Sequence, residues 1–178
     1  MKTRILKRRR DGIRQHYRVR IDRKTRAIFN QMSNSDKHST EFGGVINVNK
    51  KGELKDITVI PGKSREVDLP DGNAFKWHTH PSDGFDPPSP TDVMALLADD
   101  DQHAEIVFNN GMSISVLKTP ELEEDFLKKG KKAQEELIRE AFYKSYTPKE
   151  YKTNLEKLGF YVQINKQLNK PIVLEAKI

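Results

Sequence analysis

Apolar and polar residues alternate from Phe75 to Pro81, and this alternation predicts a β-strand. Phe75 and Trp77 occupy odd positions and suit a strand face that packs on a core. His78 and His80 occupy even positions, so both imidazoles should point to the opposite side. Pro81 has no N–H for a sheet ladder and should end the strand. The two histidines are therefore expected to reach a cleft from the end of a strand.

A capped helix is predicted shortly after this strand. Residues 82–88 are rich in Gly, Pro, Asp and Ser, which is typical of a loop that turns the chain. Ser89 followed by Pro90 is typical of an N-cap with proline at the first helical position. The apolar stripe of the helix consists of Val93, Leu96 and Leu97. Asp92 then lies in the first turn, where its carboxylate can face the end of the histidine strand.

The same kinds of pattern predict the other elements and an α+β fold. Further strands are expected at 45–48, 54–60, 105–108, 112–116, 160–164 and 172–174. Helices are expected at 27–32, within 122–142 as one helix or two, and from 148 to Gly159. Asn110-Gly111 should form a two-residue hairpin turn. This mixture favours a curled, mixed and largely antiparallel sheet that is packed by helices.

Composition limits the class of protein. The chain has 178 residues, of which 35% are hydrophobic and 33% are charged, so we expect one domain with a heavily charged surface. Cysteine is absent, which excludes disulfides and fits either a reducing compartment or a chain that avoids oxidisable residues. No apolar run approaches the ~20 residues that span a bilayer, and no apolar stretch follows the basic N-terminus as in a secretory signal. A cytoplasmic protein without a membrane segment is expected.

Positive charge is concentrated near the N-terminus. Residues 1–26 contain twelve Lys or Arg and two Asp, a net charge of +10, although the whole chain carries only +6. Apolar and cationic residues alternate after Asp11-Gly12, which predicts a basic β-hairpin arm. The arginines of this arm that we assign to partner binding are Arg8, Arg9, Arg10, Arg14, Arg18 and Arg20. The arm could bind nucleic acid or an acidic partner, or it could be a solvated strand face that covers a sheet edge.

His78, His80 and Asp92 form a candidate set of metal ligands. Imidazole donors favour zinc, copper, nickel or iron over magnesium or calcium. Three nitrogen and oxygen ligands leave one position for water, which is typical of a catalytic zinc site. We choose zinc because hydrolysis needs a Lewis acid and no redox chemistry. The alternative is structural, because Ser89 with Asp92 is close to a capping box, which needs no metal.

These residues resemble the signature of a known family. The motif His78-Thr79-His80-Pro81, then Ser89-x-x-Asp92, with Glu41-Phe42-Gly43-Gly44 upstream, is similar to that of the JAMM/MPN (JAB/MPN) metallopeptidases. The resemblance covers about residues 27–118. It implies an MPN/JAB-like catalytic core there, with the basic hairpin arm at 1–26 before it. A C-terminal helical extension with short strands, 119–178, follows the core.

The resemblance implies a role for each residue of the motif. His78, His80 and Asp92 would hold one Zn²⁺ per chain, Glu41 would act through the water on that zinc, and the Ser89 hydroxyl would stabilise the oxyanion. One departure concerns the loop between the second histidine and the serine. Residues 81–88 make it eight residues long, whereas the family pattern has seven. We therefore expect an intact metal site with an altered loop.

The resemblance further implies an activity and a partner. JAMM-type enzymes are zinc isopeptidases, so we expect hydrolysis of an amide or isopeptide bond at the C-terminus of a ubiquitin-like protein or its conjugates. Two rival interpretations stay open at this stage. The chain could be a metal-free scaffold of the same fold, or a nucleic-acid-binding module that uses the basic arm.

Overall fold

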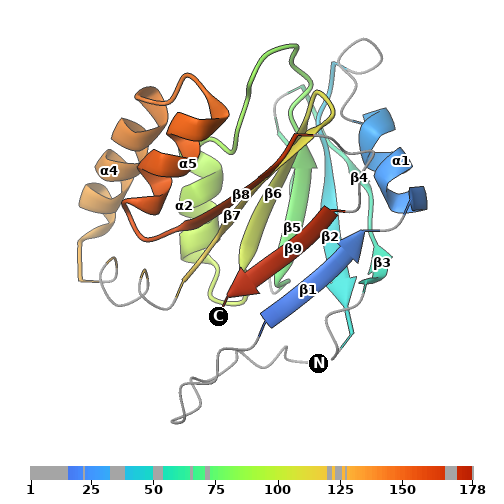
Figure 1. Ribbon diagram of the computed structural model, residues 1–178, viewed down its shortest axis with the longest axis horizontal. Helices are drawn as coiled ribbons and strands as arrows, with labels where there is room; N and C mark the ends of the chain where they lie inside the picture. Colours follow the sequence, from blue (N-terminus) through green and yellow to red (C-terminus); the bar gives the residue numbers. More distant parts are fainter. Residues whose placement is uncertain are drawn as a thin grey trace.

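The computed structural model describes most of the chain, and Figure 1 shows its elements. The described residues are 16–21, 23–32, 39–49, 54–64, 66–70, 73–119, 122, 126, 128–166 and 172–177. The strands are β1 (His16–Ile21), β2 (Phe42–Val48), β3 (Leu54–Ile57), β4 (Ile60–Pro61), β5 (Phe75–Thr79), β6 (Ala104–Asn109), β7 (Met112–Leu117), β8 (Tyr161–Asn165) and β9 (Ile172–Lys177). The helices are α1 (Arg23–Met32), α2 (Pro90–Ala98), α4 (Lys131–Tyr143) and α5 (Pro148–Glu156).

A seven-stranded sheet forms the centre of the molecule. Its strand order is β3-β2-β5-β6-β7-β8, and the short β4 pairs with the start of β2. Only β5 and β6 run parallel, with α2 as the connection between them, and the other pairs are antiparallel. The sheet is open because β3 and β8 lie at its two ends. The prediction of an α+β fold with a mixed, largely antiparallel sheet is confirmed.

Two hydrophobic clusters cover the two faces of this sheet. On one face, Phe29 of α1 stacks on Phe108 with ring centroids 3.9 Å apart and meets Trp77 edge-on. On the other face, α2, α4 and α5 pack together, as seen at the left of Figure 1. Ile114 and Val116 of β7 belong to this second cluster, whereas Leu117 belongs to the first. Successive side chains of one strand therefore enter opposite cores, as the period of two requires.

The C-terminal segment is built into the same cores. Strand β8 pairs with β7 along its whole length and so extends the main sheet. Helix α5 buries Tyr151 and Leu155 in the second cluster and is followed by Gly159, whose φ of 96° suits glycine. Within the described part of the chain, no helix combines the length and the apolar character needed to cross a bilayer.

The structure describes only part of the predicted N-terminal hairpin. Strand β1 forms as expected, but it pairs antiparallel with β9 over six residue pairs and lies next to β3. The Asp11-Gly12 turn and the first strand of the hairpin lie outside the described residues, as do Arg8, Arg9, Arg10 and Arg14. Arg18 and Arg20 are placed on β1 by their backbone only. The arm therefore stays a prediction, and β9 is a partner that the sequence did not reveal.

The predicted strand at 54–60 is wrong in one respect, because it is broken at Thr58. Strand β3 pairs with the second half of β2, and β4 pairs with its start. Between them the Thr58 hydroxyl accepts the Val45 N–H at 2.9 Å. A Cβ on Gly44 would lie 1.9 Å from the Thr58 carbonyl oxygen, so the close approach of the chain at Thr58 to β2 requires glycine at position 44.

Candidate metal centre

The end of β5 and the start of α2 bring together the residues of the predicted metal set. All five residues of β5 are buried, and His78 and His80 are 4% and 8% exposed. Ser89 is the N-cap of α2 and accepts the Asp92 N–H at 3.3 Å, while the Asp92 carboxylate accepts the Ser89 N–H at 2.6 Å. This reciprocal capping box fixes Asp92 in the first turn. The capping box expected at this helix start is therefore present, and it also directs Asp92 towards the histidines.

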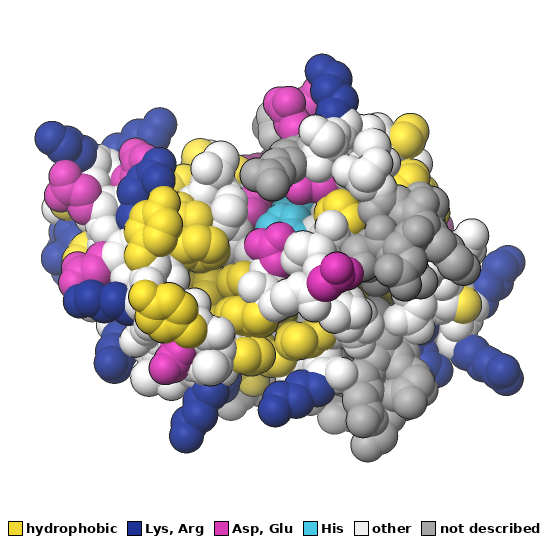
Figure 2. Space-filling model, turned by 90° about the horizontal axis from the view of Figure 1, so that it is seen from above, with side chains coloured by type: hydrophobic (Ala, Val, Ile, Leu, Met, Phe, Trp, Pro, Cys, Tyr) yellow, Lys and Arg dark blue, Asp and Glu magenta, His cyan; other side chains and the backbone are white. Residues whose placement is uncertain are grey.

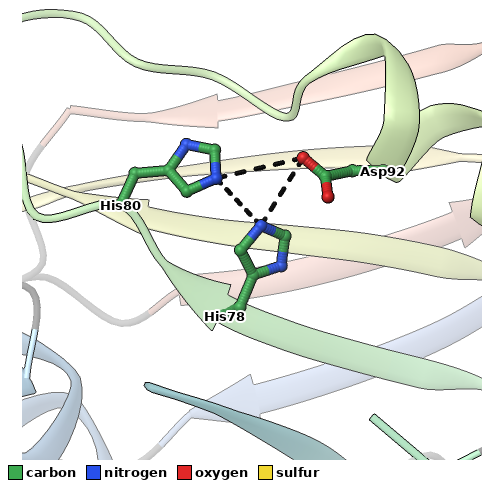
Figure 3. Close-up of side chains that lie close together, drawn as sticks. All are labelled: His78, His80 and Asp92. Carbon is green, nitrogen blue, oxygen red and sulfur yellow. Dashed lines mark hydrogen bonds and ion pairs between the residues drawn. The ribbon is translucent and has the colours of Figure 1, made fainter. Parts of the chain in front are cut away.

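Figure 3 shows how closely the three side chains approach one another. The two imidazole Nε2 atoms are 3.0 Å apart. Asp92 Oδ2 lies 3.6 Å from Nε2 of His78 and 3.9 Å from Nε2 of His80. Among the described residues, these three form a group of ligand atoms that could hold a metal ion.

The other nitrogen of each histidine already has a hydrogen-bond acceptor. His78 Nδ1 lies 2.7 Å from Oε1 of the buried Glu105, and His80 Nδ1 lies 3.0 Å from the Asp86 carbonyl oxygen. Carboxylate and carbonyl oxygens only accept, so both Nδ1 atoms carry the proton. Each neutral ring then has its lone pair on Nε2. Two lone pairs and a carboxylate oxygen converge on one point, and only a proton or a metal cation can occupy it favourably.

The spacing of the three atoms fits a metal ion of ordinary size. In a triangle with sides of 3.0, 3.6 and 3.9 Å, the point equidistant from the corners is about 2 Å from each, the length of a bond from a first-row metal to nitrogen or oxygen. The orientation of both rings by acceptors on Nδ1 is also typical of metal-binding histidines. The spacing of these atoms is therefore compatible with a divalent cation.

Without a metal, the same atoms favour a proton between them. Burial lowers the pKa of His78, but hydrogen bonds and charges from Asp92 and Glu105 outweigh this, so its pKa lies well above the ordinary value. Burial raises the pKa of Asp92, but its interactions with His78 and Ser89 outweigh burial and hold the pKa far below the usual range. The site is thus an ion pair when empty, and a metal must displace the proton of His78.

Asn109 holds the start of the loop that follows β5. Its side chain is fully buried. The Asn109 amide donates to the carbonyl oxygens of His80 and Ser82 at 3.0 and 3.1 Å, and its Oδ1 accepts the Asp86 N–H at 3.2 Å. Asp86 is therefore held where its carbonyl meets His80. With this eight-residue loop, Asp92 still approaches both histidines.

Tyr151 holds the other end of the same loop. Its hydroxyl, brought by α5, donates to the Pro88 carbonyl oxygen at 2.8 Å, and its ring meets Phe85 edge-on. Figure 2 looks down on this end of the molecule, where a small histidine surface lies in a hollow beside acidic side chains and next to an apolar surface. The C-terminal segment thus helps to fix the loop that leads from His80 to Ser89.

Glu41 lies beside the metal-binding group. Antiparallel pairing places Gly43 opposite His78, and continuing this register places Glu41 opposite His80. Glu41 is 9% exposed, and burial raises the pKa of its carboxyl group, although the charges of His78 and His80 partly oppose this. The structure therefore brings four of the five motif residues within electrostatic reach of one another, and Ser89 adjoins them through the capping box.

Three residues at the site were not found by sequence reasoning. Glu105 and Asn109 come from β6, and Tyr151 comes from α5. Glu105 appeared only as one residue of a buried strand, and nothing in its neighbourhood marked it as a partner of His78. The only usable signal was an acidic side chain within an otherwise apolar run.

Comparisons with known proteins add no relative: no family model, no curated protein and no solved structure matches this chain.

Proposed function

We propose that this protein is a zinc-dependent hydrolase that cleaves an amide or isopeptide bond. The observation that carries the proposal is that two Nε2 atoms and Asp92 Oδ2 lie around one point that is about 2 Å from each of them. Zinc bonds to imidazole nitrogen and carboxylate oxygen have lengths of about 2.0–2.2 Å. Three protein ligands leave a position for water or substrate, which favours a catalytic site over a structural one.

The residues around the zinc position support a division of chemical roles. A bound zinc supplies Lewis acidity, which polarises a carbonyl and makes water acidic near neutral pH. Glu41 accepts the proton of the attacking water and passes it to the leaving amine. The raised pKa of Glu41 suits this exchange, because a carboxyl group that must both accept and release a proton works best near the pH of the reaction.

Ser89 contributes through its hydroxyl group. Its Oγ accepts the Asp92 N–H, which leaves the hydroxyl hydrogen available as a donor. This hydrogen stabilises the oxyanion that develops on the scissile carbonyl. The resemblance to the JAMM/MPN metallopeptidases supports the same assignment. It further suggests that the substrate is a ubiquitin-like protein or its conjugates, cleaved at the C-terminal tail.

Two measurements test this function. Purified protein should contain about one zinc per chain by mass spectrometry after zinc supplementation. The variant Glu41→Ala should keep its zinc and lose hydrolysis of isopeptide-linked or C-terminally extended ubiquitin-like substrates. A zinc content below about a tenth per chain would favour the metal-free scaffold. Cleavage by Glu41→Ala at the wild-type rate would remove Glu41 from the mechanism.

A further inference from the structure

A buried polar pair lies behind His78, on the side away from the metal position. Glu105 belongs to β6, the parallel neighbour of β5, and pairs in register with Lys76. Its side chain is 5% exposed, and Gln102 beside it is 1% exposed. A carboxylate at this depth is costly unless each oxygen finds a donor.

Both oxygens of Glu105 have such donors. His78 Nδ1–H donates to Oε1 at 2.7 Å, and the Gln102 amide donates to Oε2 at 2.5 Å. The same Gln102 nitrogen also donates to the Ala104 carbonyl oxygen at 3.1 Å, which ties it to the start of β6. The carboxylate is therefore held from two sides, and its position on a central strand is rigid.

The two histidines differ in the acceptor that orients them. His80 Nδ1 donates to the Asp86 carbonyl oxygen at 3.0 Å, and the exposed Asp86 carboxylate lies farther away, at 3.4 Å. His78 Nδ1 donates directly to the buried Glu105 carboxylate at 2.7 Å. A hydrogen bond to a charged acceptor is roughly twice as strong as one to a neutral acceptor. It also increases the electron density that Nε2 can give to a cation.

We propose that Glu105, held by Gln102, is a positioning residue that fixes His78 with its proton on Nδ1 and so aims the Nε2 lone pair at the metal position. This inference rests on the metal centre proposed above. Glu105 does not touch the metal position itself. It acts through His78, sets the ring orientation before any metal arrives, and makes His78 the stronger of the two imidazole ligands.

The experiment compares three variants by their affinity for zinc, measured by competition with a chelating indicator. Glu105→Leu removes the acceptor at similar volume and should weaken zinc binding roughly 10–100-fold. Glu105→Gln keeps an acceptor oxygen for His78 and should stay within about tenfold of the wild type. Lys76→Met is the matched control, because Lys76 is the register partner of Glu105 and makes a buried ion pair with Asp99 at 2.8 Å. Its zinc affinity should equal that of the wild type.

A second readout needs no metal. Nitrogen-15 chemical shifts of His78 are recorded in metal-free protein at a pH that leaves the ring neutral. The wild type should show the Nδ1–H tautomer, and Glu105→Leu should shift the ring towards Nε2–H. Because this readout reports the proton position directly, general destabilisation of the fold does not reproduce it.

The outcomes separate the two proposals. Wild-type zinc affinity in Glu105→Leu, or an unchanged tautomer of His78, would overturn the role of Glu105. If the wild type binds no zinc, the metal centre fails and the tautomer measurement alone decides the role of Glu105. If Glu105→Leu does not fold, Gln102→Leu takes its place, because it removes the donor that holds Oε2 of Glu105. A zinc affinity of Gln102→Leu equal to that of Lys76→Met would then refute the inference.

Discussion

Substitution of Asp92 by Asn separates the two roles that this side chain has in the structure. As a helix cap, the residue accepts the Ser89 N–H at 2.6 Å, and the asparagine oxygen can still accept that bond. As a metal ligand, it supplies the charged oxygen nearest to both Nε2 atoms. Asparagine lacks that charge, so Asp92→Asn should fold with its cap and lose most of its affinity for zinc.

The expected size of the effect follows from linkage. A ligand that binds only the folded state at a thousandfold excess over its Kd stabilises the fold by about 4 kcal/mol. For a chain of this length, 1 kcal/mol shifts Tm by about 2–4 °C. Saturating zinc should therefore raise Tm of the wild type by roughly 8–16 °C. For Asp92→Asn the rise should be within about 2 °C of zero.

The assay is differential scanning calorimetry of each protein with EDTA and with excess zinc. Each shift is measured against the same variant without metal, so any cost of the substitution to the cap or to the ion pair with His78 cancels. The second capping box of the chain gives the control, because Glu150 accepts the Thr147 N–H at 3.0 Å at the start of α5. Glu150→Gln alters an equivalent helix start and should keep the full zinc shift.

Two results would refute the reasoning. A wild type whose Tm does not change with zinc has no metal centre of useful affinity. A shift in Asp92→Asn as large as that of the wild type would mean that zinc binds elsewhere, and the convergence of Asp92 with the histidines would then be only an ion pair at a helix start.

Three further predictions concern separate features. The raised pKa of His78 means that the metal-free ring carries a proton near neutral pH, so zinc binding should release about one proton. The affinity for zinc should therefore rise with pH until the pKa of His78 is passed. Calorimetry in buffers of different ionisation enthalpy measures the proton release, and its absence would contradict the prediction. Gly44→Ala should cost roughly 1–3 kcal/mol in chemical denaturation because its Cβ meets the Thr58 carbonyl, whereas Gly84→Ala, with open space around it, should change little. Joint replacement of Arg8, Arg9 and Arg10 by Ala should weaken salt-dependent nucleic-acid binding, and a wild type without such binding would end that hypothesis.

A proton and a metal ion at this site account for different parts of its geometry. A proton on His78 Nε2 explains the 3.0 Å contact with His80 and the ion pair with Asp92. It does not require an acceptor on Nδ1 of both rings, nor an oxygen at a distance that completes a metal-sized triangle. The same three residues are therefore compatible with a shared proton and with a divalent cation.

Local patterns in the sequence determined much of what lies close along the chain. The period of two placed His78 and His80 on one side of β5, and Ser89 with Pro90 marked the start of α2. Asn110-Gly111 predicted the β6–β7 hairpin, where both residues have the positive φ that such a turn needs. These features depend on neighbours within a few residues, so sequence alone is sufficient to predict them.

Tertiary structure decided which distant segments meet. Glu105 reaches His78 across 27 residues, Tyr151 reaches Pro88 across 63, and β1 pairs with β9 from the far end of the chain. No local pattern encodes such contacts, because they follow from the strand order that buries apolar surface while giving most buried polar groups a partner. The candidate ligands could be predicted from the sequence, whereas the residues that orient them are known only from the tertiary structure.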